Sequence, residues 1–290
     1  MRLRSYLVVG LLGLGSLGFL ADHLAGEEAG RGFDYSDYAA VLARFVDGQG
    51  RVDYRCLREN REQLDTFVNS LADFPPRYYY RWPRADRIAL WINACNAHVL
   101  QVVINHYPIR PSWAGVGFPK NSIRQIDGAL ERPPVSVMGT KMTVRELVRH
   151  LAEDFGEPRV HFALNPASLG GPPLRPQPYT GARLDQQLEQ QARLFLADPA
   201  NFSIDARHDV VVLSALFKDF GGDFADTYGT DKLFAGHNRN QRAVLNFISS
   251  HVGQQARRYL LSEKYTVQYL EYDWRLNVQG GSTAAKRQFR

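Results

Sequence analysis

Residues 87–108, RIALWINACNAHVLQVVINHYP, decide the fold, because their spacing predicts one helix that is apolar on almost every side. At about 100° per residue the Ile, Leu, Val, Trp and Ala side chains cover most of the helix surface, and such a helix lies inside a protein. Asn93 and Asn96 fall within this apolar arc, where a carboxamide without hydrogen-bond partners is costly. We therefore expect them either to brace a particular backbone or to form part of a polar site.

The composition is that of a globular chain with a real core. The 290 residues are 44% hydrophobic and 12% aromatic, and 35 basic residues stand against 30 acidic ones. The basic residues form no Lys/Arg block of the kind that binds a phosphate backbone. We therefore expect no nucleic-acid partner, and the expected partner is an unknown small molecule or another exported protein.

The N-terminus predicts export. Arg2 and Arg4 precede an uncharged run over residues 7–20, as in the n-region and h-region of a secretory signal. The run is well short of the roughly 20 residues that span a bilayer, yet no clean cleavage site follows it. Residues 1–25 are therefore predicted to be a signal peptide or a signal anchor, which leaves two locations open: periplasmic or otherwise extracytoplasmic, and anchored to the inner membrane. Residues 26–34 are expected to be a linker, and residues 278–290 a disordered tail.

Hydrophobic periodicity and turn residues predict helices with several short strands between them. Helices are expected over residues 35–45, 52–71, 87–108, 143–153, 184–197 and 240–251, with another beginning in 213–217. Strands are expected at 159–164, at 202–204 paired with 210–213, at 266–274, and in a hairpin over 135–142 that turns at Gly139 and Thr140. Thr143 and Glu146 have the spacing of a capping box, and residues 112–134 are rich in Gly and Pro, which predicts a long surface loop. The predicted fold is α+β, a single mostly helical domain over residues 35–277 packed on a small, largely antiparallel sheet.

A second informative segment is residues 160–180, VHFALNPASLGGPPLRPQPYT, in which a predicted strand leads into a loop dense in Gly and Pro. Loops held on rigid strands often carry function. The polar groups that such a loop could direct at a ligand are His161, Asn165, Ser168, Arg175 and Tyr179, and the amides of Gly170 and Gly171 could approach an anion. The alternative is that these glycines and prolines only shape a turn, and that His161 is a core histidine.

Together these motifs resemble the family known as domain of unknown function 547. Its pattern is a W-I-N-A-Y-N-A helix ending in H-Y-P, then H-F-A-L-N/V and a C-P-P-L-R-like loop. The counterparts here are residues 91–97, 106–108, 161–165 and 172–175, with further matches at 52–54, 213–224, 272–274 and 276–277. The resemblance covers about residues 35–277 and implies a shared fold, but no common activity.

Departures from the family pattern argue against thiol chemistry. Many relatives carry cysteines where this chain has Pro166 and Gly171, and Cys95 stands at the usual tyrosine of the helix motif. A cysteine in the middle of an apolar helix face lacks the setting that lowers a thiol pKa, so we expect Cys95 to pack in the core. Asp219 replaces an aromatic residue and is expected at a helix end. Because no Cys/His spacing typical of zinc occurs, neither a metal nor another cofactor is expected.

Two classes of function remain, and whether the chain is an enzyme stays open. We favour a domain that binds a ligand or partner in a groove between the helix at 91–98 and the loop at 161–179, through Asn93, Asn96, Asn165, Arg175 and Tyr179. In this arrangement Asn93 and Asn96 are expected to bond the backbone of residues 161–175 or His161 itself.

The alternative is a hydrolase or transferase. His161 would be the base, oriented by Asp223 or Asn93, with Ser168 as nucleophile and the amides of Gly170 and Gly171 as the oxyanion site. That hypothesis requires His161 within hydrogen-bond reach of Asp223 or an asparagine, in an open cleft.

Overall fold

The computed structural model describes residues 32–132 and 134–280. The predicted signal, most of the predicted linker and residues 281–290 lie outside the described residues. At the N-terminal end Phe33 already packs against Phe67 and Phe74, with ring centroids 5.8 and 5.1 Å apart. At the other end Gln279 donates its amide to the carbonyl of Val52 at 3.0 Å. Phe33 and Gln279, which lie just outside the predicted limits of 35 and 277, therefore contact residues inside them.

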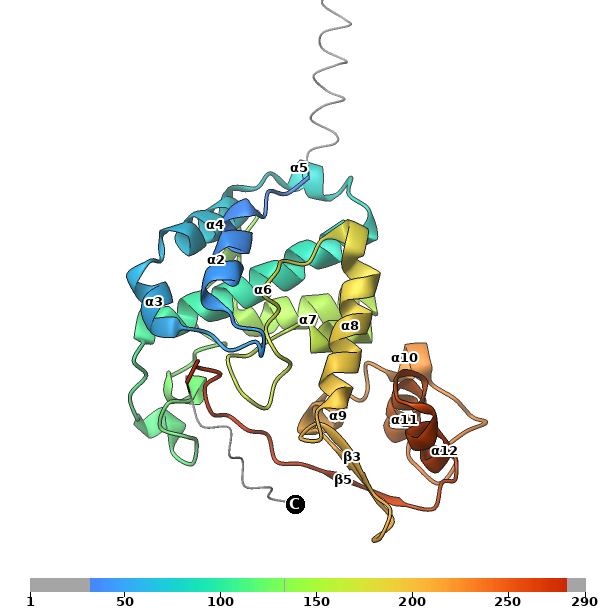
Figure 1. The fold of residues 1–290 in the computed structure, drawn as a ribbon. Coiled ribbons are helices and arrows are strands. Elements are labelled where there is room, and N and C mark those ends of the chain that lie inside the picture. The colour runs from blue at the N-terminus through green and yellow to red at the C-terminus, as the bar shows by residue number, and fades with distance from the viewer. Residues whose placement is uncertain (1–31, 133, 281–290) are drawn as a thin grey trace, which may run out of the picture.

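The central element is helix α6, Arg84–His106, which forms as its sequence predicts. It begins directly after Pro83, and 16 of its side chains are buried. Figure 1 shows it running through the larger part of the molecule, with other helices around it. These are α2 (Ser36–Phe45), α3 (Tyr54–Glu59), α4 (Glu62–Asp73), α5 (Pro76–Tyr79), α7 (Val144–Phe155) and α8 (Leu184–Ala197). By length and composition α6 could cross a membrane, but 89% of its most apolar window is buried, so it is a core helix.

The C-terminal part of the chain builds a smaller lobe with its own core. Its sheet has the order β3–β4–β5, formed by Phe202–Asp205, Val210–Leu213 and Thr266–Tyr269. β3 and β4 are antiparallel, as predicted, whereas β5 lies parallel to β4. The helices of this lobe are α9 (Ala215–Asp219), α10 (Ala225–Tyr228), α11 (Arg239–His251) and α12 (Gln254–Leu260). The predicted α+β class is confirmed, with a three-stranded sheet that is mixed.

A short hairpin precedes α7. Its strands are β1 (Val135–Val137) and β2 (Thr140–Met142). The turn lies at Met138 and Gly139, which both have positive φ, one residue earlier than predicted. Their amides donate to the carbonyls of Leu71 and Ala72 at 2.7 and 2.8 Å, and this fixes the hairpin to the end of α4. The capping box of Thr143 and Glu146 is present at the start of α7.

Two sequence predictions of secondary structure are wrong. The helix expected over 52–71 is divided into α3 and α4, because Asn60, with φ −129° and ψ 54°, leaves the helical region. The strand expected at 159–164 is the 3₁₀-helix η3, Pro158–Phe162. In that segment Val160 packs into the larger core and Phe162 into the smaller one. Their alternation therefore comes from two separate cores and only imitates the period of a strand.

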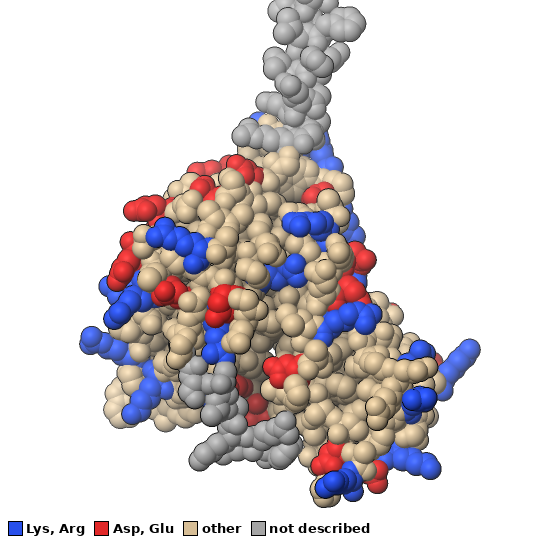
Figure 2. Space-filling view, viewed as in Figure 1, with Lys and Arg blue, Asp and Glu red and all other residues tan. Residues whose placement is uncertain are grey.

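The surface carries charges of both signs. Figure 2 shows Lys and Arg side chains interspersed with Asp and Glu over the visible face. In the described residues of the loop between 107 and 134, the regular elements are the short 3₁₀-helices η1 (Trp113–Gly115) and η2 (Ile123–Gln125). Most of it lies on the surface, as predicted, but Ser122, Ile123 and Gln125 are buried, and they tie the loop to the larger core.

Candidate functional site

Asn93 and Asn96 use their side-chain amides to hold the following chain segment against α6. Asn96 donates to the carbonyl of Ala163 and accepts from the amide of Asn165, both at 2.9 Å. Asn93 donates to the carbonyl of Tyr179 at 2.8 Å and accepts from the amide of the same residue at 2.9 Å. Asn96 thus makes the expected contact with residues 161–175, whereas the partner of Asn93 lies four residues beyond them. Each carboxamide replaces a backbone partner in the core.

Asn165 extends this contact into a buried polar network that joins distant parts of the chain. Its side chain donates to the carbonyl of Pro172 at 2.6 Å, and its side-chain oxygen accepts from the amide of Ala167 at 2.8 Å and from Asn277 at 3.1 Å. Asn277 in turn accepts from the hydroxyl of Tyr54 at 2.6 Å. The separated motifs at 52–54, 91–97, 161–165 and 276–277 therefore meet at one set of hydrogen bonds.

This network lies where a groove was predicted between the helix at 91–98 and the loop at 161–179. The helix at 91–98 and the loop at 161–179 are in direct contact, since Asn93, Asn96 and Asn165 are all buried and bonded between them. Their polar atoms bind the protein itself. These three residues therefore have the geometry of braces.

His161 lies beside Asp223, as the catalytic hypothesis requires, but not in an open cleft. The Nε2 atom of His161 is 2.7 Å from a carboxylate oxygen of Asp223, whose side chain is 41% exposed against 2% for His161. The imidazole stacks on Phe220, with centroids 4.1 Å apart and planes at 21°. The half-exposed carboxylate of Asp223 thus contacts a buried imidazole. The contact also connects η3, which carries His161, to the smaller lobe, which carries Asp223.

The other residues assigned to catalysis have partners of their own. The Ser168 hydroxyl is 2.7 Å from the hydroxyl of Tyr272 and is buried. The amide of Gly170 donates to the carbonyl of Asp273 at 2.9 Å, so it is not available as an oxyanion donor. Burial raises the pKa of the Tyr272 phenol above its usual range, and it stays a neutral partner for Ser168.

Arg175 and Tyr179 form a contact next to the braces. The guanidinium of Arg175 lies over the Tyr179 ring, 5.8 Å from its centroid, and its terminal nitrogens reach the side-chain oxygen of Gln190 at 3.4 Å. The Tyr179 hydroxyl is buried and has no hydrogen-bond partner among the described residues. Burial raises its pKa. Of the predicted ligand residues, these two keep polar atoms that are free of strong internal bonds.

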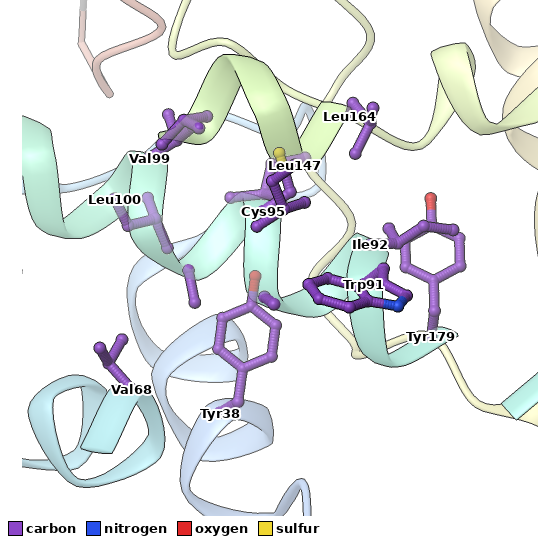
Figure 3. Close-up of a cluster of buried hydrophobic side chains, with 14 of the residues drawn as sticks. Tyr38, Val68, Trp91, Ile92, Cys95, Val99, Leu100, Leu147, Leu164 and Tyr179 are labelled. Atoms are coloured by element: carbon purple, nitrogen blue, oxygen red, sulfur yellow. The ribbon is translucent and has the colours of Figure 1, made fainter. Parts of the chain in front are cut away.

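Cys95 is a core residue, as expected. It is 2% exposed, and Figure 3 shows its sulfur among apolar side chains that include Val99 and Leu147. Burial raises the pKa of the thiol to about 12, so it remains protonated at neutral pH. Cys56 is also a free thiol and is partly exposed. Neither cysteine has the setting of a nucleophile.

The structure also contains a pocket that the sequence predictions missed. It has a volume of about 400 Å³ and lies between α5, the first two turns of α6, the hairpin and α7. We call it the aromatic cup. The side chains that give it chemical character are Tyr79, Tyr80, Arg84, Arg87, Trp91 and His150. A signal for it was present, because Arg84, Arg87 and Trp91 follow the i, i+3, i+7 spacing of one helix face.

Hydrogen-bond donors dominate the aromatic cup. The indole of Trp91 donates to the hydroxyl of Tyr79 at 2.8 Å, which leaves that hydroxyl its own hydrogen to donate. The guanidinium of Arg87 lies over the Tyr79 ring, 5.9 Å from its centroid, and its buried Nε has no hydrogen-bond partner among the residues that the structure describes. Arg84 bonds the carbonyl of Phe155. The cup therefore offers positive charge and free donors beside flat aromatic surfaces.

His150 forms one wall of the cup. Its Nδ1 atom pairs with the carboxylate of Asp154 one turn later on α7, and its ring meets the Trp91 ring edge to face at 4.6 Å. Its Nε2 atom is buried and has no hydrogen-bond partner within residues 32–132 and 134–280. Asp154 thus orients the imidazole and is itself the one acidic side chain that lines the cup. Among the described residues, no group of three or more His, Cys, Asp or Glu side chains could hold a metal ion.

These features define an α+β domain whose buried central helix is locked by side-chain amides, with a donor-rich cup at the start of that helix. Residues 79–196 match the model of the family described as "Protein of unknown function, DUF547". The resemblance found in the sequence is therefore confirmed over these residues, which include α6, the asparagine braces and nearly all of the cup. No curated protein and no solved structure matches the chain.

Proposed function

We propose that this domain binds a small anion with a flat apolar part in the aromatic cup. The observation that carries the proposal is Arg87. Its guanidinium lies over an aromatic ring but has no carboxylate partner in the described part of the chain, and its buried Nε has no hydrogen bond there either. A buried donor without a partner is costly. A carboxylate or phosphate oxygen that pairs with the Arg87 guanidinium would make a charge-assisted hydrogen bond.

The remaining walls of the cup fit the rest of such a ligand. Tyr79 and Trp91 supply aromatic faces, and Tyr79 keeps a hydrogen for a second acceptor atom. The N-terminal end of α6, where Arg84 and Arg87 lie, adds the positive end of the helix dipole. A volume of about 400 Å³ falls in the range of small-molecule sites. The expected ligand class is an aromatic carboxylate or phosphate.

We also propose that the domain works outside the cytoplasm. Residues 1–25 have the sequence of a secretory signal or signal anchor, and their composition is the support for this location. A membrane tether would exist only if that segment stays uncleaved. Intact-mass measurement of the protein recovered from cell fractions tests both points, because cleavage removes the mass of the N-terminal segment.

The ligand proposal is tested by calorimetric titration with benzoate, phenyl phosphate and their neutral isostere benzyl alcohol. The two anions should bind and raise the melting temperature, since a ligand that binds the folded state stabilises it. Benzyl alcohol should bind at least about tenfold more weakly, because a hydrogen bond to a charged group contributes roughly 1.5–3 kcal/mol. Equal binding of the alcohol would contradict the proposal.

Arg87→Gln provides the residue-level test. It removes the charge and the terminal nitrogens but keeps a polar amide near the position of Nε, and it should weaken benzoate binding at least about tenfold. Arg81→Gln is the matched control, because Arg81 is exposed and does not line the cup. It makes the same change of net charge and should leave binding within about twofold, since surface charge effects are small. If both variants bind benzoate like the original chain, the cup is not the site.

A second candidate function is the hydrolase or transferase that uses His161, Asp223 and Ser168. The contact of His161 with Asp223 at 2.7 Å favours it, whereas the burial of His161 and the bond of Ser168 to Tyr272 do not. Turnover of p-nitrophenyl acetate and p-nitrophenyl phosphate, compared between the original chain and Asp223→Asn, tests it. Turnover that Asp223→Asn abolishes would support catalysis, and its absence from the original chain would contradict it.

A further inference from the structure

The loop over residues 109–125 presents apolar side chains to solvent. Trp113 is 94% exposed and Val116 is 71% exposed, and Trp113 is the most exposed of the large hydrophobic residues that the structure describes. Exposed apolar groups grouped on one loop often mark an interaction site. This loop lies apart from the aromatic cup, and none of its residues lines that pocket.

The loop is held in this shape by one buried side chain. Gln125 is only 6% exposed, and its side-chain oxygen accepts from the amide of Ser112 at 2.7 Å. Its side-chain nitrogen reaches the carbonyls of Gly115 and Phe118 at 2.9 and 3.1 Å. A Cβ on Gly115 would lie 2.2 Å from the Gln125 side-chain oxygen, so only glycine fits there. The loop conformation that Gln125 stabilises therefore leaves Trp113 exposed.

The charged side chains of this loop are all basic. Residues 109–125 contain Arg110, Lys120 and Arg124 but no Asp or Glu. Arg124 is occupied, because it lies 3.6 Å from Glu131 and over the rings of Phe118 and Trp274. Arg110 and Lys120 are exposed. The loop therefore combines an exposed apolar tip with two exposed cations.

We propose that this loop docks on an anionic lipid bilayer. Trp113 and Val116 enter the boundary between headgroups and acyl chains, where tryptophan is favoured, and Arg110 and Lys120 pair with lipid phosphates. The apolar tip is too small for a stable protein interface. An aromatic side chain buries at most about 250 Å², whereas such an interface buries about 800 Å² on each partner.

The loop lies far from the start of the described chain in the view of Figure 1. Figure 1 places the loop at the lower left of the view and the start of the described chain at the top, next to α5. Figure 2 shows Lys and Arg side chains in the same lower-left region. In this proposal the apolar and basic side chains of the loop itself make the contact with the bilayer.

The test uses the full chain with vesicles of phosphatidylcholine alone, or of phosphatidylcholine mixed with phosphatidylglycerol, each carrying brominated acyl chains that quench tryptophan. The chain has four tryptophans, so Trp113→Phe supplies the background from the other three. The expected result is quenching on the phosphatidylglycerol vesicles that Trp113→Phe removes, with at most weak quenching on phosphatidylcholine alone. This local readout is valid whether or not the N-terminal segment also holds the chain on the vesicle.

Replacing single lysines tests the electrostatic part of the proposal. Lys120→Gln should lower the partition coefficient roughly fivefold, as expected for one basic residue near an anionic surface. Lys218→Gln, an exposed lysine on α9, makes the same charge change elsewhere and should leave partition unchanged. The proposal is overturned if Trp113 stays unquenched on both kinds of vesicle, if quenching is equal on both, or if the two lysine variants behave alike. The pocket can still bind its anion in any of these outcomes.

Discussion

The side-chain oxygen of Asn96 accepts the backbone amide of Asn165 at 2.9 Å, while the nitrogen of the same carboxamide donates to the carbonyl of Ala163. All of these atoms lie in the core, and Asn96 is 2% exposed. The contact explains how an otherwise apolar helix tolerates a polar residue at its centre. It also attaches residues 161–175 to α6 without any regular secondary structure between them.

Asn96→Leu should therefore destabilise the domain strongly. The substitution is close in volume, but it leaves two buried backbone groups without partners, each of which costs about 1–3 kcal/mol. We expect a loss of about 3 kcal/mol in the free energy of unfolding, measured by urea denaturation. Asn105→Leu is the control on the same helix, because Asn105 is exposed and its side chain accepts from Arg61 at the surface. Its effect should stay within about 0.5 kcal/mol, and equal effects would contradict the bracing role of Asn96.

Tyr54→Phe tests whether the two ends of the domain are joined through Asn277. The phenol of Tyr54 is fully buried and donates to the Asn277 side-chain oxygen at 2.6 Å. Removing only the hydroxyl leaves that oxygen without this donor and should cost about 1–2 kcal/mol of unfolding free energy. Tyr80→Phe makes the same chemical change on a side chain that is 74% exposed. An equal, small effect of both variants would mean that the hydroxyl of Tyr54 contributes nothing.

The sequence was most informative where a structural signal is local. The helix around Asn93 and Asn96, the capping box at Thr143 and Glu146, and the strand pair β3–β4 all follow from spacing within a few residues. The braces could be anticipated because a buried carboxamide must find a partner. Their partners could be placed only in the neighbourhood of 161–175, and Tyr179 lay outside that range.

Features formed by residues far apart in the chain could not be predicted from local sequence patterns. Val160 and Phe162 alternate because they enter two different cores, and no local pattern distinguishes that from a strand. The aromatic cup draws on α5, α6, α7 and the hairpin, so its members never stand together in the sequence. The contact of His161 with Asp223 was one of two that the catalytic hypothesis allowed, the other being with an asparagine, but the stacking of Phe220 over the imidazole was not foreseen.

The two thiols should differ in reactivity in the folded chain. Cys95 is 2% exposed, and burial raises its pKa to about 12. Cys56 is partly exposed, although the hydrogen bond that its thiol donates to Asp53, and then burial, raise its pKa as well. Since the thiolate is the reactive form, iodoacetamide near pH 8 should label Cys56 slowly and leave Cys95 unlabelled.

Mass spectrometry of the alkylated chain checks this prediction peptide by peptide. In guanidinium chloride both cysteines should react, and the folded Cys56→Ser variant should take up no label. Labelling of Cys95 in the folded chain at a rate near that of Cys56 would mean that α6 opens readily, and this would contradict the rigid core described above.

His98 should make the domain sensitive to acid. Its ring is 1% exposed, and neither ring nitrogen has a hydrogen-bond partner among the described residues. Burial lowers its pKa to about 4, from an ordinary value of 6.5, and outweighs the Gln101 side chain and the Ser136 backbone, which lie close enough to raise the pKa but make no hydrogen bond of good geometry. Between these two values the unfolded chain binds the proton and the folded chain does not, so the free energy of unfolding falls as the pH falls.

His98 should therefore leave the free energy of unfolding constant above about pH 6.5 and lower it as the pH falls from about 6.5 to 4. Below that it should have no further effect, and the total loss should be about 3 kcal/mol. Urea denaturation at a series of pH values measures it. His98→Leu should flatten this part of the curve, because a leucine takes up no proton. His106→Gln, which removes an exposed histidine from the same helix, should keep the original slope. A slope unchanged by His98→Leu would mean that other groups cause the acid sensitivity.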